Sequence, residues 1–334
     1  MQATLISDLQ TQKISKQERQ WLTNPFLGGL ILFSRHFEDK QQLTDLVSEI
    51  KSINSRLLIT VDHEGGRVQR FRQGFTHVPA MGKLGQLWQY DSVRAAQLAY
   101  DSAVVLCYEL AEVGIDLTYA PVLDIDYGHN QVVGDRSFSS DSTVLMNLAK
   151  QFLAGQKQLG FASVGKHFPG HGWVDLDSHV ACPEDNRSLV EIEQADLACF
   201  QRLLPQLDWV MPAHVIYKQV DDKPAGFSSI WINQILRQQM GFAGPVVSDD
   251  LSMQAAAAIG DYAKRGQAAL SAGCNVLLAC NEQAAPLELL DFLENNASES
   301  LDLSIYQPKI ALHDDNKQAY VQSKKRIKEY INEF

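Results

Sequence analysis

Residues 161–172 read FASVGKHFPGHG, in which an apolar run of strand length leads directly into a lysine, histidines, a proline and glycines. Asp175, Asp177 and His179 follow a few residues later. Glycine is costly to order and clustered titratable groups resist burial, so this composition is more typical of a functional loop than of a spacer. The same form recurs in VVSDDLSM at residues 246–253. Both stretches predict strands that carry a functional site at their ends.

Similar short apolar runs recur along the chain, each followed by polar residues and then by a segment of helical period. In one such segment, Leu43, Leu46, Val47 and Ile50 have the i, i+3, i+4, i+7 spacing of an amphipathic helix. Strands that alternate with helices, without a linker-like stretch between them, predict an α/β fold: one (β/α)8 TIM-type barrel forming a single domain over residues 1–334. The predicted strands are Ala3–Ser7, Gly29–Phe33, Leu57–Asp62, Ile115–Ala120, Ala162–Lys166, Trp209–His214, Val246–Asp249 and Asn275–Cys280.

The barrel hypothesis makes a prediction about where polar residues lie. Barrels of this class carry their chemistry at the carboxyl ends of the strands. Polar side chains follow the predicted strands at that end, as Asp62 to Arg70, Asp124 to Arg136, Lys166-His167, His214 and Ser248 to Asp250. No G-x-G-x-x-G motif opens the first helix, so a dinucleotide-binding fold is disfavoured.

Composition limits the class of partner and the cell compartment. Hydrophobic residues make up 45% of the 334 residues and charged residues 21%, an ordinary globular balance. The net charge of −11 argues against nucleic acid and anionic membranes as partners. The basic cluster Lys324-Lys325-Arg326 with Lys328 is interpreted as a solvated helix face.

The cysteine pattern and the N-terminus both favour the cytoplasm. The five cysteines are odd in number and widely spaced, which predicts reduced thiols. The N-terminus lacks the basic and apolar regions of a signal peptide, and no run of about 18 apolar residues occurs. We therefore expect a cytoplasmic protein.

The predicted site is compatible with three kinds of chemistry. Lys166 could form a Schiff base, although neighbouring carboxylates would hold it charged. Histidines and carboxylates could bind a metal ion, although H-x-x-x-H in a Pro/Gly loop does not place both imidazoles on one helical face. Asp249 could be the nucleophile of a glycosyl transfer. A non-catalytic sugar-binding barrel is a fourth possibility.

Four motifs resemble the signatures of family 3 glycoside hydrolases, in that family's order: Asp62-x-Glu64-Gly65-Gly66-Arg67-Val68-x-Arg70, Gly134–Phe138, Lys166–Gly172 and Ser248–Met253. More narrowly, they are similar to the single-domain cytoplasmic β-N-acetylglucosaminidases of bacterial peptidoglycan recycling. The resemblance implies removal of non-reducing N-acetylglucosamine from 1,6-anhydro-N-acetylmuramic acid, with or without a peptide. It implies a small-molecule muropeptide substrate and neither a metal nor another cofactor. Other members carry an additional domain with a carboxylate acid, which we do not expect here.

The resemblance also implies roles for individual residues. Asp249 matches the nucleophile, His179 the general acid/base and Asp177 the partner of that histidine. The sugar-binding positions are matched by Asp62, Arg70, Arg136, Lys166 and His167. Two residues depart from the family pattern, since His63 stands where glutamine is expected and Pro245 where an aliphatic residue is expected.

The histidine dyad is also physically reasonable in itself. An imidazole has an unperturbed pKa near ~6.5, so it can both give and take a proton near neutrality, and a carboxylate such as Asp177 would orient it. The rival acid is Glu64, which we interpret as tying the Gly65-Gly66 turn to an arginine. Asp250 is interpreted as a helix cap beside the nucleophile.

Overall fold

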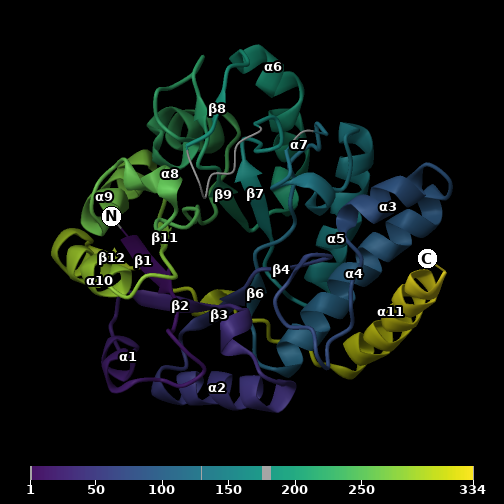
Figure 1. Cartoon of the computed structure of the whole chain (residues 1–334), viewed down its shortest axis with the longest axis horizontal. Helices are drawn as coiled ribbons and strands as arrows, with labels where there is room; N and C mark the ends of the chain where they lie inside the picture. The colour runs from purple at the N-terminus through teal and green to yellow at the C-terminus, as the bar shows by residue number, and fades with distance from the viewer. Residues whose placement is uncertain (1, 129, 175–181, 334) are drawn as a thin grey trace.

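The computed structural model describes residues 2–128, 130–174 and 182–333, and its central feature is a ring of parallel strands (Figure 1). Hydrogen-bonded neighbours follow the order β11-β1-β2-β3-β6, and β7 pairs with β9. Isolated parallel bridges join Val122 to Lys166, Val210 to Val246 and Val247 to Val276. These bridges close the ring and confirm the predicted TIM-type barrel. The ring strands are β1 (Gln2–Ser7), β2 (Leu27–Leu32), β3 (Leu58–Val61), β6 (Leu117–Thr118), β7 (Val164–Phe168), β9 (Trp209–Pro212) and β11 (Val276–Leu278), with residues 246–247 between β9 and β11.

The strands are buried on both faces, as a ring covered by helices requires. Successive side chains alternate between two apolar clusters. Ile31 belongs to the cluster inside the ring, which also contains Tyr119, Trp209 and Met211, whereas Leu30 and Leu32 belong to the cluster that includes the helices.

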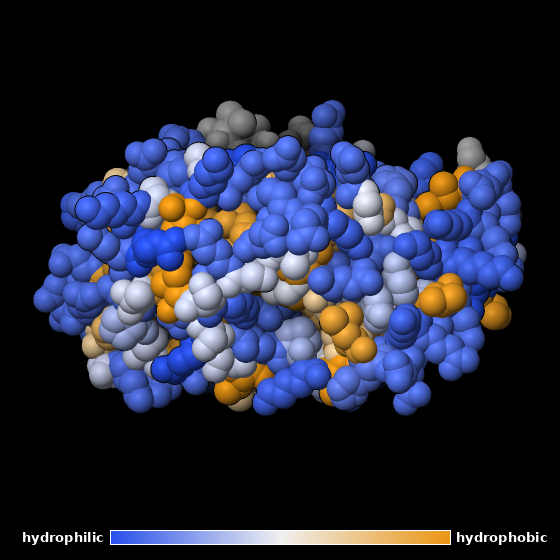
Figure 2. All heavy atoms as spheres, turned by 90° about the horizontal axis from the view of Figure 1, so that it is seen from below, coloured by the Kyte–Doolittle hydropathy of each residue, from blue (hydrophilic) through white to orange (hydrophobic). Residues whose placement is uncertain are grey.

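Helices follow the ring strands along the chain. In α2, the four predicted apolar residues are all buried, and Asp39 caps the helix by accepting a hydrogen bond from the Gln42 amide. The helices are α1 (Lys16–Trp21), α2 (Lys40–Ile53), α3 (Met81–Trp88), α4 (Ser92–Glu112), α5 (Ser142–Gln158), α6 (Leu189–Gln194), α7 (Asp196–Leu203), a π-helix (Ile230–Gln239), α8 (Gln254–Ala257), α9 (Tyr262–Ala272), α10 (Ala285–Asn296) and α11 (Asp314–Asn332). Figure 2 shows that one face of the molecule is largely hydrophilic, with small separate hydrophobic patches.

Several short strands lie in the loops between the ring strands and the helices. β4 (His63–Gly65) and β5 (Val68–Gln69) form an antiparallel pair directly after β3. β8 (Glu184–Asp185) pairs with β10 (Ile216–Tyr217), and β12 (Glu299–Ser300) pairs with β1. Within the described residues, no helix is long and apolar enough to span a membrane.

The basic cluster of α11 corrects the prediction of a solvated face. Arg326 donates two hydrogen bonds of 2.6 Å to Asp101, a fully buried residue of α4. Lys324 lies 2.9 Å from Glu109, which is also buried. Lys325, whose side chain is 77% exposed, and Lys328 remain solvated, whereas the long side chains of Lys324 and Arg326 reach buried carboxylates of α4. The cluster therefore attaches the C-terminal helix to the barrel.

Arg326→Met should lower the free energy of unfolding by roughly 2–3 kcal/mol, because it leaves the Asp101 carboxylate buried without its guanidinium partner. Lys325→Met is the matched control. The Lys325 side chain is 77% exposed and lies 3.8 Å from Glu329, so its loss should cost less than about 0.5 kcal/mol. Urea unfolding followed by circular dichroism measures both variants, and equal midpoints would contradict an anchoring role for Arg326.

Candidate active site

A cavity of about 620 Å³ lies at the carboxyl ends of the strands. Polar loops reach it from several strands, because parallel strands direct their carboxyl ends to one side of the ring. It brings together six of the residues predicted from sequence: Asp62, Arg70, Arg136, Lys166, His167 and Asp249. The remaining two, His179 and Asp177, lie outside the described residues.

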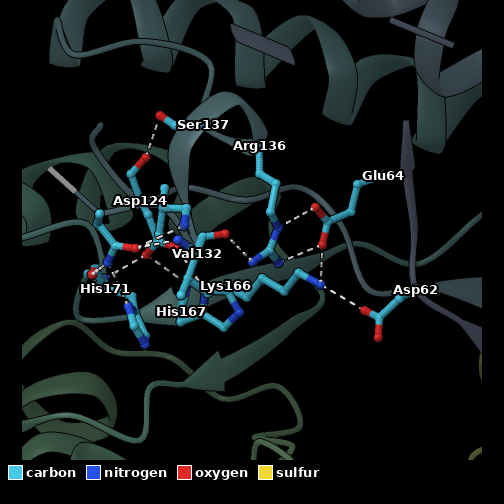
Figure 3. A network of polar contacts seen from close by, with 12 residues as sticks. Asp62, Glu64, Asp124, Val132, Arg136, Ser137, Lys166, His167 and His171 are labelled. Carbon is cyan, nitrogen blue, oxygen red and sulfur yellow. Dashed lines mark hydrogen bonds and ion pairs between the residues drawn. The ribbon is translucent and has the colours of Figure 1, made fainter. Parts of the chain in front are cut away.

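Lys166 is the centre of the charged network in this cavity (Figure 3). Its ammonium group lies 2.9 Å from Oδ1 of Asp62 and 2.6 Å from Oε1 of Glu64. Arg136 binds Glu64 through two hydrogen bonds of 2.8 Å, and Arg70 lies 3.7 Å from the second oxygen of Asp62. Two carboxylates thus hold three cations in fixed positions at the cavity wall.

The network determines the protonation of its members. Burial alone would raise the pKa of Glu64, but Arg136 and Lys166 outweigh burial and hold that pKa well below its usual range. Burial would lower the pKa of Lys166, but Asp62 and Glu64 outweigh it and raise that pKa. Glu64 is therefore ionised and Lys166 charged at neutral pH. A charged Lys166 is a poor Schiff-base nucleophile, and an ionised Glu64 has no proton to donate.

Asp124 organises the loop that contains the two histidines. Its carboxylate accepts hydrogen bonds from the His167 and His171 amides at 3.0 and 2.8 Å, and lies 2.7 Å from Nδ1 of His167. Burial raises the pKa of Asp124, but His167 outweighs burial and lowers it to about 2. Asn130 donates a hydrogen bond of 2.8 Å to the His171 carbonyl. Sequence reasoning placed Asp124 at a strand end but missed this anchoring role, because no motif spacing links it to His171.

The two consecutive aspartates have different surroundings. Asp249 lines the cavity and accepts a hydrogen bond from the Asp250 amide at 2.8 Å. Asp250 does not cap a helix, contrary to prediction. Its carboxylate accepts from the Ser252 and Cys280 amides, and the Cys280 thiol lies 3.0 Å from it. Asp250 joins the loop that follows residues 246–247 to the end of β11, because the parallel ring places these two ends side by side.

His63, the residue at the position where glutamine is expected, is buried away from the cavity. Its ring packs against Phe71 and Phe75, and burial lowers its pKa to about 3. His63 is therefore neutral and belongs to an aromatic cluster behind Asp62.

No group of three or more histidine, cysteine, aspartate or glutamate residues in the described part of the chain is arranged to hold a metal ion. His179 lies outside the described residues.

The chain belongs to glycosyl hydrolase family 3, since the model of the family's N-terminal domain matches residues 3–307. A beta-hexosaminidase from Tolumonas auensis is 49% identical over 294 residues, covering 87% of this chain and 86% of that protein. A beta-hexosaminidase from Neisseria gonorrhoeae is 47% identical over 290 residues, covering 86% and 80%. The protein is therefore a glycoside hydrolase of the β-N-acetylhexosaminidase type, as its motifs indicate.

Solved structures agree with this assignment. Native NagZ from Neisseria gonorrhoeae is 41% identical and superposes with a TM-score of 0.90, covering 98% of this chain and 97% of that one. The same NagZ has been solved in complex with N-trifluoroacetyl-D-glucosamine, with a TM-score of 0.89 and the same coverage. The fold and the enzyme class are thus established together.

Proposed function

We propose that this enzyme removes non-reducing N-acetylglucosamine from peptidoglycan fragments, namely GlcNAc-1,6-anhydroMurNAc with or without a peptide. The observation that carries the proposal is that Asp249 shares one cavity with the charged network around Lys166. A nucleophile beside rigid charged groups suits a small polar sugar, because charge-assisted hydrogen bonds grip hydroxyl and acetamido groups strongly. The NagZ complex with an N-acylated glucosamine analogue supports the same class of ligand.

The proposed mechanism is double displacement with retention at the anomeric carbon. The Asp249 carboxylate attacks that carbon as the glycosidic bond breaks, and the leaving oxygen takes a proton from His179. Asp177 orients the imidazole. In the second step His179 accepts a proton from water, which attacks the same carbon and releases Asp249. This acid assignment is supported by Glu64, the rival carboxyl group, being held ionised by Arg136 and Lys166.

We assign sugar recognition to the cations and carboxylates at the cavity wall. Arg136, Lys166 and His167 hold the sugar, while Asp62 and Arg70 contact its distal hydroxyls. Asp62 suits that role because its side chain is 23% exposed, although it already contacts Lys166. It can therefore accept from a hydroxyl without losing its present partner.

We place the reaction in the cytoplasm. All five cysteines are free thiols, four of them buried, as is usual for a protein of a reducing compartment. The peptidoglycan fragments would have to be imported there before cleavage.

NMR of the reaction tests the proposal directly. Incubation with GlcNAc-1,6-anhydroMurNAc should release N-acetylglucosamine first as the β-anomer, with no dependence on phosphate or EDTA. Initial formation of the α-anomer would exclude retention. Cleavage of simple chromogenic glycosides without cleavage of this disaccharide would exclude the proposed substrate.

Lys166→Ala should reduce kcat/KM by at least about 30-fold, which corresponds to the ~2 kcal/mol of one charge-assisted hydrogen bond to the sugar. The matched control is Lys264→Ala, which removes an exposed lysine of α9 that pairs with its neighbour Asp261. Circular dichroism checks that both variants fold. An unchanged kcat/KM for a folded Lys166→Ala variant would remove Lys166 from the binding site.

A further inference from the structure

A second cavity, of about 670 Å³, lies between α3, the C-terminal end of α11 and the loop after β5. We propose that this groove binds the acidic peptide carried by the sugar that leaves. The inference rests on the proposed function and extends it, because it gives the peptide of the substrate a binding site on the enzyme.

The groove adjoins the active-site cavity at Arg67, which lines both. Arg67 is held in place by a contact of 3.2 Å with Asp135 and by hydrogen bonds to the carbonyls of Gln131 and Val132 at 3.0 and 2.5 Å. Gln131 and Val132 also line the active-site cavity. A ligand that leaves the sugar pocket over this arginine would therefore enter the groove.

The Gly65-Gly66 turn gives the two cavities a common wall. Glu64 lies on one side of the turn and faces Lys166. On the other side, Arg72 donates a hydrogen bond of 3.1 Å to the Gly66 carbonyl. Gly66 has a φ of +55°, and a Cβ there would lie 2.7 Å from that of Ala80, so the turn requires glycine. Arg72 thus lies beside the turn that separates the groove from the active-site cavity.

The groove is positively charged in a protein whose net charge is −11. Arg67, Arg72 and Lys83 line it, and its one lining carboxylate among the described residues, Asp135, is already paired with Arg67. Arg72 and Lys83 are exposed, and neither forms an ion pair within the described part of the chain. Two cations are thus available to carboxylates of a ligand, which guanidinium groups bind with two parallel hydrogen bonds.

Apolar surface lies beside these cations. Leu87 and Pro79 line the groove, as does Tyr90, a residue that is 91% exposed. In Figure 1, α3 and the C-terminal end of α11 flank this region. Cations beside an apolar strip suit a short peptide that alternates carboxylates with small apolar side chains. An extended peptide of three or four residues spans roughly 10–14 Å, enough to reach from a neighbouring pocket into the groove.

The test compares two substrates, the disaccharide GlcNAc-1,6-anhydroMurNAc alone and the same disaccharide bearing an acidic tetrapeptide. The double variant Arg72→Gln/Lys83→Gln should raise KM about 3- to 10-fold for the peptide-bearing substrate, the effect of losing two exposed ion pairs. The kcat should not change, because such contacts are made equally in the ground and transition states. KM for the peptide-free disaccharide should also stay constant, which confirms that the variant folds.

The control variant Arg56→Gln/Lys16→Gln removes the same charge outside the groove and should leave both KM values unchanged. The single variant Lys83→Gln, which disturbs no hydrogen bond to the turn, should show part of the effect. Equal KM changes for the two substrates, or none in the Arg72/Lys83 variant, would overturn the proposal. Failure of the proposed function would be seen separately, as wild-type enzyme that cleaves neither disaccharide, and the groove proposal would then fall with it.

Discussion

Asp249→Ala should reduce cleavage of every β-N-acetylglucosaminide by on the order of 10⁴-fold or more, whatever the leaving group. The reason is that a nucleophile forms its bond to the anomeric carbon in every substrate, so a good leaving group cannot replace it. Wild-type enzyme quenched with a fluorinated glycoside should carry the sugar on a peptide that contains Asp249. Mass spectrometry of the digested protein measures this adduct.

Asp250→Asn is the matched control, because it changes the neighbouring carboxylate and keeps the shape of the side chain. In the wild-type protein the Ser252 and Cys280 amides donate hydrogen bonds to the Asp250 carboxylate. The side-chain oxygen of asparagine can accept the same two hydrogen bonds. We expect this variant to fold and to keep measurable activity. An adduct on Asp250, or an active Asp249→Ala enzyme beside an inactive Asp250→Asn enzyme, would transfer the nucleophile to Asp250.

The barrel could be predicted from sequence because each of its strands is buried on both faces. Buried parallel strands appear in the sequence as short continuous apolar runs. Such a run predicts a strand at Val246–Asp249, where the structure joins residues 246–247 to the ring through isolated bridges. Strand limits were less predictable. The predicted run Ile115–Ala120 narrows to β6, Leu117–Thr118, because the limits of a strand are set by its backbone pairing, here with Thr60 and Val61 of β3. Apolar character does not reveal that pairing.

Motif residues at the strand ends could be predicted as one site, but their mutual contacts could not. The sequence predicts that Glu64 binds an arginine, because a glutamate before a Gly-Gly turn needs a cationic partner when it is buried. The structure identifies that arginine as Arg136, which donates two hydrogen bonds to Glu64. The anchoring role of Asp124 was not predicted, because its contacts run to backbone amides of a loop that only the fold brings near. The attachment of Arg326 to Asp101 escaped prediction for the same reason, as these residues lie on separate helices.

His179→Ala should separate substrates by their leaving groups. Protonation by an acid matters only when the departing oxygen is strongly basic. The variant should therefore cleave alkyl or sugar aglycones about 10²–10⁴-fold more slowly, while keeping most of its glycosylation rate on a dinitrophenyl aglycone. Asp177→Ala should show a milder form of the same pattern, because the imidazole is present but not oriented. Pre-steady-state release of the aglycone measures the glycosylation step alone.

Glu64→Gln is the control that distinguishes the two candidate acids. Glu64 is ionised between Arg136 and Lys166, so its replacement should disturb the position of both cations and slow all substrates by a similar factor. A uniform loss in Glu64→Gln, together with a leaving-group-dependent loss in His179→Ala, would assign the proton to the imidazole. The opposite pair of results would assign it to Glu64. That outcome would require the carboxyl group to gain a proton when substrate displaces Lys166 and Arg136, because these cations are what hold its pKa low.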